Sequence, residues 1–172
     1  RSTRGASTRV EICIDFADNN FLRTAQRVLS QWASSEGMLE VKWYDSNTFR
    51  MPMVVIDNLG SYDTARAMEL VSSYGMPRTD TYTGVYAIRD SEIGVTLVPN
   101  DEMYNIRSTA LIQLDEIQAS DQQPLSSWMP FIPLGVVRGE IQDRELFESA
   151  GYPLVLSAVC LYTGALRRGR WE

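Results

Sequence analysis

The chain has 172 residues, of which 44% are hydrophobic and 22% are charged, and its formal net charge is −6. These values are typical of one globular domain with its own core, and they exclude a disordered chain. No apolar run approaches the roughly 20 residues that a membrane-spanning helix needs, so no membrane span is expected.

The first half of the chain predicts strands and two amphipathic helices. Residues 8–16 alternate apolar and other side chains, which indicates a strand. In residues 19–34 the apolar positions recur at three- and four-residue spacing, which predicts a helix that buries one stripe. Residues 38–45 and 51–57 are expected to be strands, the second at a sheet edge or a strand start because it contains a proline. Residues 61–75 predict a second helix.

The second half is richer in predicted strands. Residues 83–99 indicate a β-hairpin whose turn lies in the segment RDSE. Residues 106–117 alternate side chains of two kinds and are expected to form another strand. Further strands are expected at residues 134–141 and 152–164, with a helical turn or a loop at residues 143–151.

These elements predict an α+β fold in which two amphipathic helices pack on a mixed, largely antiparallel sheet. One globular domain is expected at residues 10–166, between basic tails at residues 1–9 and 167–172. Without the six tail arginines and Glu172, the body has 10 basic against 21 acidic residues, so it lacks the basic stripe of a nucleic-acid-binding domain. Because the chain opens with Arg1 rather than Met, we expect a piece of a longer polypeptide.

The chain contains no histidine. This excludes Ser–His and Cys–His nucleophile pairs, zinc bound through histidine, and haem with a proximal histidine. A general base would have to be a carboxylate, a tyrosine or Lys42, which is the only lysine. The sequence therefore favours a protein without catalytic activity, and no cofactor is expected.

The two cysteines, Cys13 and Cys160, both lie in apolar segments that predict strands. Two thiols without histidine do not make a four-ligand zinc site, so both are expected to be small buried hydrophobic residues. A disulfide between them requires that the two strands be neighbours.

Three aspartates follow predicted strands and precede predicted helices: Asp15, Asp18 and Asp57. The favoured interpretation is that they satisfy free N–H groups at helix starts and complement the helix dipole. The alternative is a carboxylate-based metal-binding or hydrolytic site, in which Asp15 and Asp57 end adjacent parallel strands and converge. No glycine-rich phosphate loop accompanies them.

Aromatic residues outside the regular elements suggest a surface for contacts. The segment SSWMPFIPLG holds Trp128, Met129 and Phe131 on a backbone that two prolines keep extended. Trp and Met in such a segment are typical of interface hot spots, although a connection that covers the core has the same composition. At the C-terminus, Trp171 follows Arg167 and Arg168 and belongs to the same class of candidate contact.

The segments TGVYAIRDSEIGVTLVP and YPLVLSAVCLYTGALRRGRW, with an arginine-bearing leading segment, resemble strands and basic termini of small viral coat proteins. The helix expected at residues 19–34 departs from a simple jelly roll, and the resemblance assigns no family. The favoured function is a non-enzymatic structural or protein-interaction module from a larger assembly, such as a virion, that binds a protein partner or itself. Alternatives are the carboxylate site and nucleic-acid contact through the arginine-rich termini only.

Overall fold

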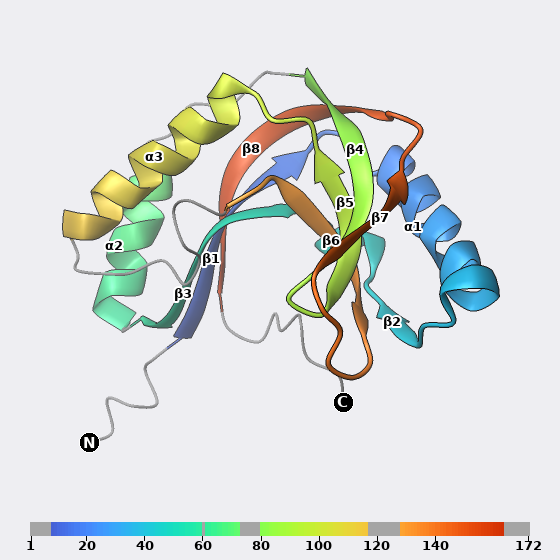
Figure 1. Ribbon diagram of the computed structural model, residues 1–172. Helices are drawn as coiled ribbons and strands as arrows, with labels where there is room; N and C mark the ends of the chain where they lie inside the picture. Colours follow the sequence, from blue (N-terminus) through green and yellow to red (C-terminus); the bar gives the residue numbers. More distant parts are fainter. Residues whose placement is uncertain (1–7, 60, 73–79, 117–127, 164–172) are drawn as a thin grey trace.

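The computed structural model describes residues 8–59, 61–72, 80–116 and 128–163 (Figure 1). Within these ranges, three α-helices pack on a sheet of eight strands whose pairings are all antiparallel. The predicted α+β class is confirmed. The strands are β1 (Thr8–Phe16), β2 (Val41–Trp43), β3 (Met51–Leu59), β4 (Asp80–Arg89), β5 (Glu92–Leu97), β6 (Phe131–Val137), β7 (Arg144–Glu148) and β8 (Pro153–Thr163). The helices are α1 (Asn20–Trp32), α2 (Ser61–Ser72) and α3 (Asp101–Glu116).

The sheet has two parts that β4 joins. Its strand order is β2-β6-β5-β4-β8-β1-β3, with β7 paired to β4 outside this path. The start of β4 pairs with β8, whereas the rest of β4 pairs with β5 and β7. Helices α2 and α3 lie together on the part formed by β8, β1 and β3, and α1 lies on the far side against the other part (Figure 1).

Strand β1 is central to its part of the sheet and shows why the chain folds in this way. Its even-numbered residues Val10, Ile12 and Ile14 are at most 2% exposed and belong to the hydrophobic core. The alternation of side chains along a strand places Glu11 and Cys13 on the opposite face. Both are also buried, so β1 has an apolar face and a buried polar face.

Several predicted elements are confirmed. The strand at residues 8–16 and the helix begun at Asn20 are present, and β3, which contains Pro52, is an edge strand. The hairpin of β4 and β5 turns at Asp90 and Ser91, which both have positive φ, as a tight turn between twisted strands requires.

The strand expected at residues 106–117 is wrong, because residues 106–116 belong to α3, while residue 117 lies outside the described residues. The Asn100 side chain accepts a hydrogen bond from the backbone N–H of Met103 at 2.9 Å and caps the helix. Met103, Arg107 and Ala110 are buried at helical spacing, so one stripe of α3 faces the sheet. The alternation seen in the sequence was short enough to fit either structure.

The helical turn or loop expected at residues 143–151 is also wrong. Residues 144–148 form β7, whose backbone pairs with β4. Phe147 is its main apolar contact, with its ring centroid 4.7 Å from that of Tyr86 and 5.7 Å from that of Trp32. Tertiary pairing decides this strand, since its local sequence shows no strand pattern.

Within the described ranges, no helix combines the length and the apolar character that crossing a membrane requires.

Candidate functional site

The backbone register places Asp15 and Asp57, which were proposed as metal ligands, far apart along their strands. Asp15 and Asp57 lie on the neighbouring strands β1 and β3, but these strands are antiparallel rather than parallel. Ile14 pairs with Met51 and Thr8 pairs with Leu59, so the two aspartates lie near opposite ends of the strand pair. In the ranges that the structure describes, no group of three His, Cys, Asp or Glu side chains could hold a metal ion.

Asp18 has the local role expected of a residue at a helix start. Its Oδ1 accepts a hydrogen bond from the backbone N–H of Asn20 at 2.8 Å, and its Oδ2 accepts one from the Asn20 side chain at 3.2 Å. Asp15 instead accepts a hydrogen bond from the thiol of Cys160, with 3.2 Å between Sγ and Oδ2. Of the two, only Asp18 contacts the first turn of α1.

The two cysteines lie directly opposite each other on β1 and β8, so their strands are neighbours, as a disulfide would require. No disulfide joins Cys13 to Cys160 in this structure. Cys13 donates a hydrogen bond to Oε1 of Glu11 at 3.5 Å. Burial, followed by the hydrogen bond and the charge of Asp15, raises the pKa of Cys160 to about 11.

A buried ion pair lies on the polar face of β1. Nε of Arg50 is 3.3 Å from Oε1 of Glu11, and Nη1 of Arg50 donates to the carbonyl of Thr48 at 3.1 Å. Both charged side chains are at most 5% exposed. This pair could not be predicted from the sequence, because the two residues are 39 positions apart and nothing local marks them as partners.

Trp128 also lies inside the molecule, at 7% exposure. Its indole N–H donates to the carbonyl of Pro52 at 3.3 Å, and the guanidinium of Arg107 lies 5.1 Å from its ring centroid. The Tyr104 ring meets the same indole edge-on. These contacts make Trp128 part of the hydrophobic core rather than of an exposed surface.

The other predicted contact residues differ in exposure. Met129 is 45% exposed, whereas Phe131 is half-buried at the start of β6. Arg167, Arg168 and Trp171 lie outside the described residues. A contact of these residues with a protein partner, a second copy or nucleic acid stays a prediction.

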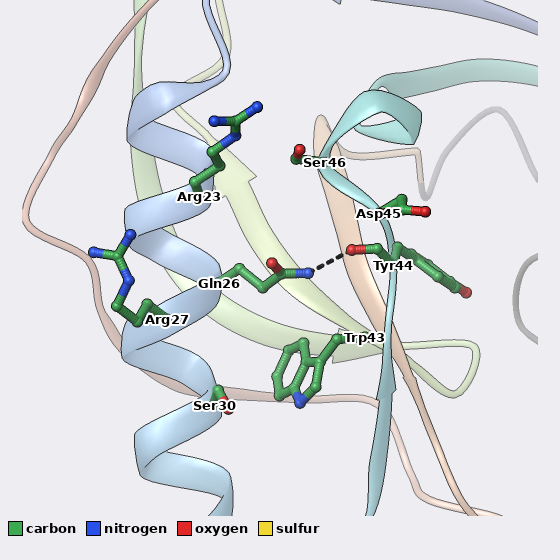
Figure 2. Close-up of a pocket in the computed structure, with 8 residues that line it drawn as sticks. All are labelled: Arg23, Gln26, Arg27, Ser30, Trp43, Tyr44, Asp45 and Ser46. Carbon is green, nitrogen blue, oxygen red and sulfur yellow. Dashed lines mark hydrogen bonds between the residues drawn. The ribbon is translucent and has the colours of Figure 1, made fainter.

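An open groove lies between α1 and the segment that runs from β2 into the short 3-10 turn Ser46–Thr48 (Figure 2). We name it the α1–β2 groove, and its volume is about 470 Å³. Its lining residues are Arg23, Gln26, Arg27, Ser30, Trp43, Tyr44, Asp45 and Ser46. The first four come from α1 and the others from the facing segment, and all but Trp43 are polar or charged at their tips.

The charged groups of the groove are accessible to solvent. Arg23 and Arg27 are four residues apart on α1, so they project from the same face, one helical turn from each other, and both are exposed. Asp45 is the carboxylate of the opposite wall. The groove therefore has a net positive charge on a chain whose net charge is −6, and an anion is the ligand that this charge favours.

Trp43 contributes the aromatic surface of the groove, and β6 leaves room for it. Trp43 pairs with Gly135 across β2 and β6. A Cβ atom at Gly135 would lie 2.9 Å from Cε3 of Trp43 and 2.8 Å from Cγ1 of Val41. The missing side chain thus allows the indole to rest against the β6 backbone, half-buried, with the rest of the ring available to a ligand.

Gln26 fixes the distance between the two walls. Its Nε2 donates to the carbonyl of Tyr44 at 2.8 Å (Figure 2). The same Nε2 donates to the carbonyl of Leu134 at 3.0 Å. At the end of the groove, Nδ2 of Asn19 donates to the carbonyl of Ser46 at 3.0 Å. These bonds hold α1 against β2, β6 and the Ser46–Thr48 turn.

The sequence analysis missed the groove. The sequence does contain one sign of it, which is the helical spacing of Arg23 and Arg27 on the polar face of α1. Nothing in the sequence showed that Trp43 and Asp45 face that helix, because the pairing of β2 with β6 brings together residues about 90 positions apart.

No protein-family model matches the sequence, and no curated protein sequence matches it. Solved structures do match. E. coli LigT complexed with 3′-AMP has a TM-score of 0.68 at 10% identity, covering 95% of this chain and 92% of that one. A structure described as a phosphoesterase has a TM-score of 0.66 at 10% identity over the same shares of both chains. The PDE domain of MHV ns2 has a TM-score of 0.52 at 10% identity, over 87% of this chain and 97% of that one. What is shared is the fold.

These comparisons correct the functional expectation. The prediction of a non-enzymatic structural or protein-interaction module is wrong, because the solved structures that share this fold include one described as a phosphoesterase and the PDE domain of MHV ns2. The resemblance to viral coat proteins rested on strand patterns and basic ends. Antiparallel strands with such patterns occur in many folds, so they did not distinguish a coat protein from this architecture.

Proposed function

We propose that this chain binds phosphate-bearing nucleotides in the α1–β2 groove. The observation that carries the proposal is the arrangement of Arg23 and Arg27, one helical turn apart, across an open groove from Trp43. Guanidinium groups form charge-assisted hydrogen bonds with phosphate oxygens, and an indole stacks on a nucleobase.

The structures that share the fold support this ligand class. E. coli LigT has been solved with 3′-AMP, with ATP, with NADP⁺ and with phosphate, and each of these ligands contains phosphate. At identities of 9 to 12%, these comparisons show a shared fold and nothing more. The ligand class proposed for this chain therefore depends on its own groove.

The charge of the groove favours a mononucleotide over a nucleic-acid strand. Two arginines can neutralise the phosphates of one nucleotide, whereas a strand needs a longer basic track. Asp45 and Ser46 provide acceptors for ribose hydroxyl groups on the same wall as Trp43. A volume of about 470 Å³ lies within the range of small-ligand sites.

Phosphodiester hydrolysis is a second candidate, which the shared phosphoesterase fold favours. Without histidine, the proton of an attacking water would pass to a carboxylate, and Asp45 is the one that lines the groove. Arg23 and Arg27 would stabilise the charge that develops on the phosphoryl oxygens.

Isothermal titration of the whole chain with ATP and with 3′-AMP at low ionic strength tests the binding proposal. Replacing Arg23 and Arg27 together with Ala is expected to weaken binding by at least about tenfold, because a hydrogen bond to a charged group contributes ~1.5–3 kcal/mol. Arg66→Ala is the matched control, since Arg66 lies on α2, is exposed and pairs with Glu69. Absence of binding to the unaltered chain, or equal binding by the double variant, would contradict the proposal.

Release of p-nitrophenol from bis(p-nitrophenyl) phosphate tests the second candidate. Turnover that Asp45→Asn abolishes and that persists after chelation of metal ions would support a carboxylate base. Nucleotide binding without turnover would exclude hydrolysis of this substrate and leave the binding proposal intact.

A further inference from the structure

We propose that Gln26 makes the α1–β2 groove select nucleobases that carry an exocyclic amino group, such as adenine and cytosine, over uracil and hypoxanthine. This inference rests on the proposed function and specifies the ligand of the same groove. The observation behind the inference is the set of hydrogen bonds that the Gln26 side-chain amide makes.

The orientation of the Gln26 amide is determined by its partners. Its Nε2 faces two backbone carbonyls, those of Tyr44 at 2.8 Å and Leu134 at 3.0 Å. A carbonyl oxygen only accepts hydrogen bonds, so the amino end of the amide must face both carbonyls and the flipped amide would place oxygen against oxygen. Both N–H donors of Gln26 are used in these bonds, and the amide oxygen is fixed on the other side.

Gln26 therefore offers the groove an acceptor and no donor. Figure 2 shows the amide oxygen pointing away from the bond to Tyr44, on the side of the groove. On α1, Gln26 lies between Arg23 and Arg27, and its bonded partner Tyr44 directly follows Trp43. Figure 2 shows the Gln26 side chain between Arg23 and Trp43, so the fixed acceptor lies between one phosphate-binding cation and the aromatic surface.

A fixed acceptor distinguishes bases by one group. The amino groups of adenine and cytosine donate hydrogen bonds, whereas hypoxanthine and uracil have a carbonyl oxygen at the corresponding position. A carbonyl placed against the Gln26 oxygen would leave both acceptors without a donor after water is removed. Discrimination of this kind is stronger than discrimination by shape, because the wrong ligand leaves a desolvated polar group unpaired.

The test compares two ligand pairs that differ in this group and have the same phosphate charge: CTP with UTP, and ATP with ITP. Dissociation constants are measured by titration calorimetry with the whole chain. We expect CTP and ATP to bind about 5- to 100-fold more tightly than UTP and ITP, which is the range that one well-formed base contact provides.

Gln26→Met removes the acceptor at similar side-chain length and is expected to bring both ratios close to one. The ratio is the readout because a partly unfolded sample lowers all four affinities equally. Gln31→Met is the matched control, since Gln31 is an exposed residue of α1 that does not line the groove, and it should keep the wild-type ratios.

The possible results separate this inference from the proposed function. Equal affinities of the unaltered chain for all four nucleotides would overturn base selection by Gln26 and leave nucleotide binding standing. Preference that persists in Gln26→Met would assign selection to another residue and overturn the inference. If no nucleotide binds, both proposals fail. Only the result for Gln26→Met needs a variant, and the other results need the unaltered chain alone. The inference therefore stays testable even if Gln26→Met does not fold.

Discussion

Glu11 on β1 and Arg50, the residue before β3, form an ion pair inside the protein, with 3.3 Å between Oε1 and Nε. The pair joins two adjacent strands on the polar face of the sheet, and the Cys13 thiol donates to the same carboxylate oxygen. A buried charge that loses its partner has neither water nor a counter-ion, so each residue depends on the other.

Replacing either residue of this pair with Ala is expected to lower the free energy of unfolding by ~3–5 kcal/mol. Glu11→Leu combined with Arg50→Met removes both charges and should cost clearly less than the sum of the two single replacements. Urea denaturation measures both effects. As a control, Glu69→Ala breaks an exposed pair with Arg66, at 3.8 Å, and should cost at most ~0.5 kcal/mol. A single replacement of Glu11 or Arg50 as mild as this control would show that the charges are not desolvated.

Gly135→Ala is expected to weaken nucleotide binding several-fold. The new Cβ would meet Val41 and the indole of Trp43 at 2.8–2.9 Å and the carbonyl of Lys42 at 3.0 Å, so β2 and the aromatic wall must shift. Calorimetric titration with ATP measures the effect. Gly84→Ala is the control, because its Cβ would meet Oγ1 of Thr96, which does not line the groove. Equal affinity losses in the two variants would indicate general destabilisation rather than displacement of Trp43.

Asn100→Ala is expected to destabilise the protein by ~1 kcal/mol, because it removes the side-chain acceptor for the backbone N–H of Met103. Asn100→Asp keeps an acceptor at the same place and should retain most of the stability. Thermal unfolding followed by circular dichroism measures both. An unchanged midpoint in the Ala variant would mean that water replaces the cap without cost.

The thiol of Cys160 is expected to react slowly with iodoacetamide at pH 8. Its pKa is raised from 9.0 to about 11, so the reactive thiolate is scarce and its fraction increases as the pH rises towards 11. Asp15→Asn removes a nearby negative charge that disfavours the thiolate, which should lower the pKa and speed the reaction. Mass spectrometry of the modified peptide measures the rate at each pH. Asp18→Asn, which alters a carboxylate at the start of α1, should leave the rate unchanged.

The elements that the sequence predicted well have strong local signals. The strand at residues 8–16 and the helix α1 show clear periodicity, and the hairpin of β4 and β5 has polar turn residues between two apolar runs. Each of these patterns reflects which side chains of the element face the hydrophobic core. The α+β class followed from them, together with the edge position of β3.

The fold and the candidate site depend on information that local patterns lack. Residues 106–116 alternate like a strand but form the end of α3, because Asn100 caps the helix and its buried stripe meets the sheet. The antiparallel pairing of β1 with β3 separates Asp15 from Asp57, and no property of either segment specifies that direction. The α1–β2 groove likewise exists because β2 pairs with β6 and because Gln26 of α1 donates hydrogen bonds to Tyr44 on the facing wall and to Leu134 on β6. By itself, the sequence determined the apolar faces of β1 and α1 and the chemistry that the absent histidine excludes. Only the tertiary structure decided which polar groups meet, because strand order and direction are set by packing between segments far apart in the chain.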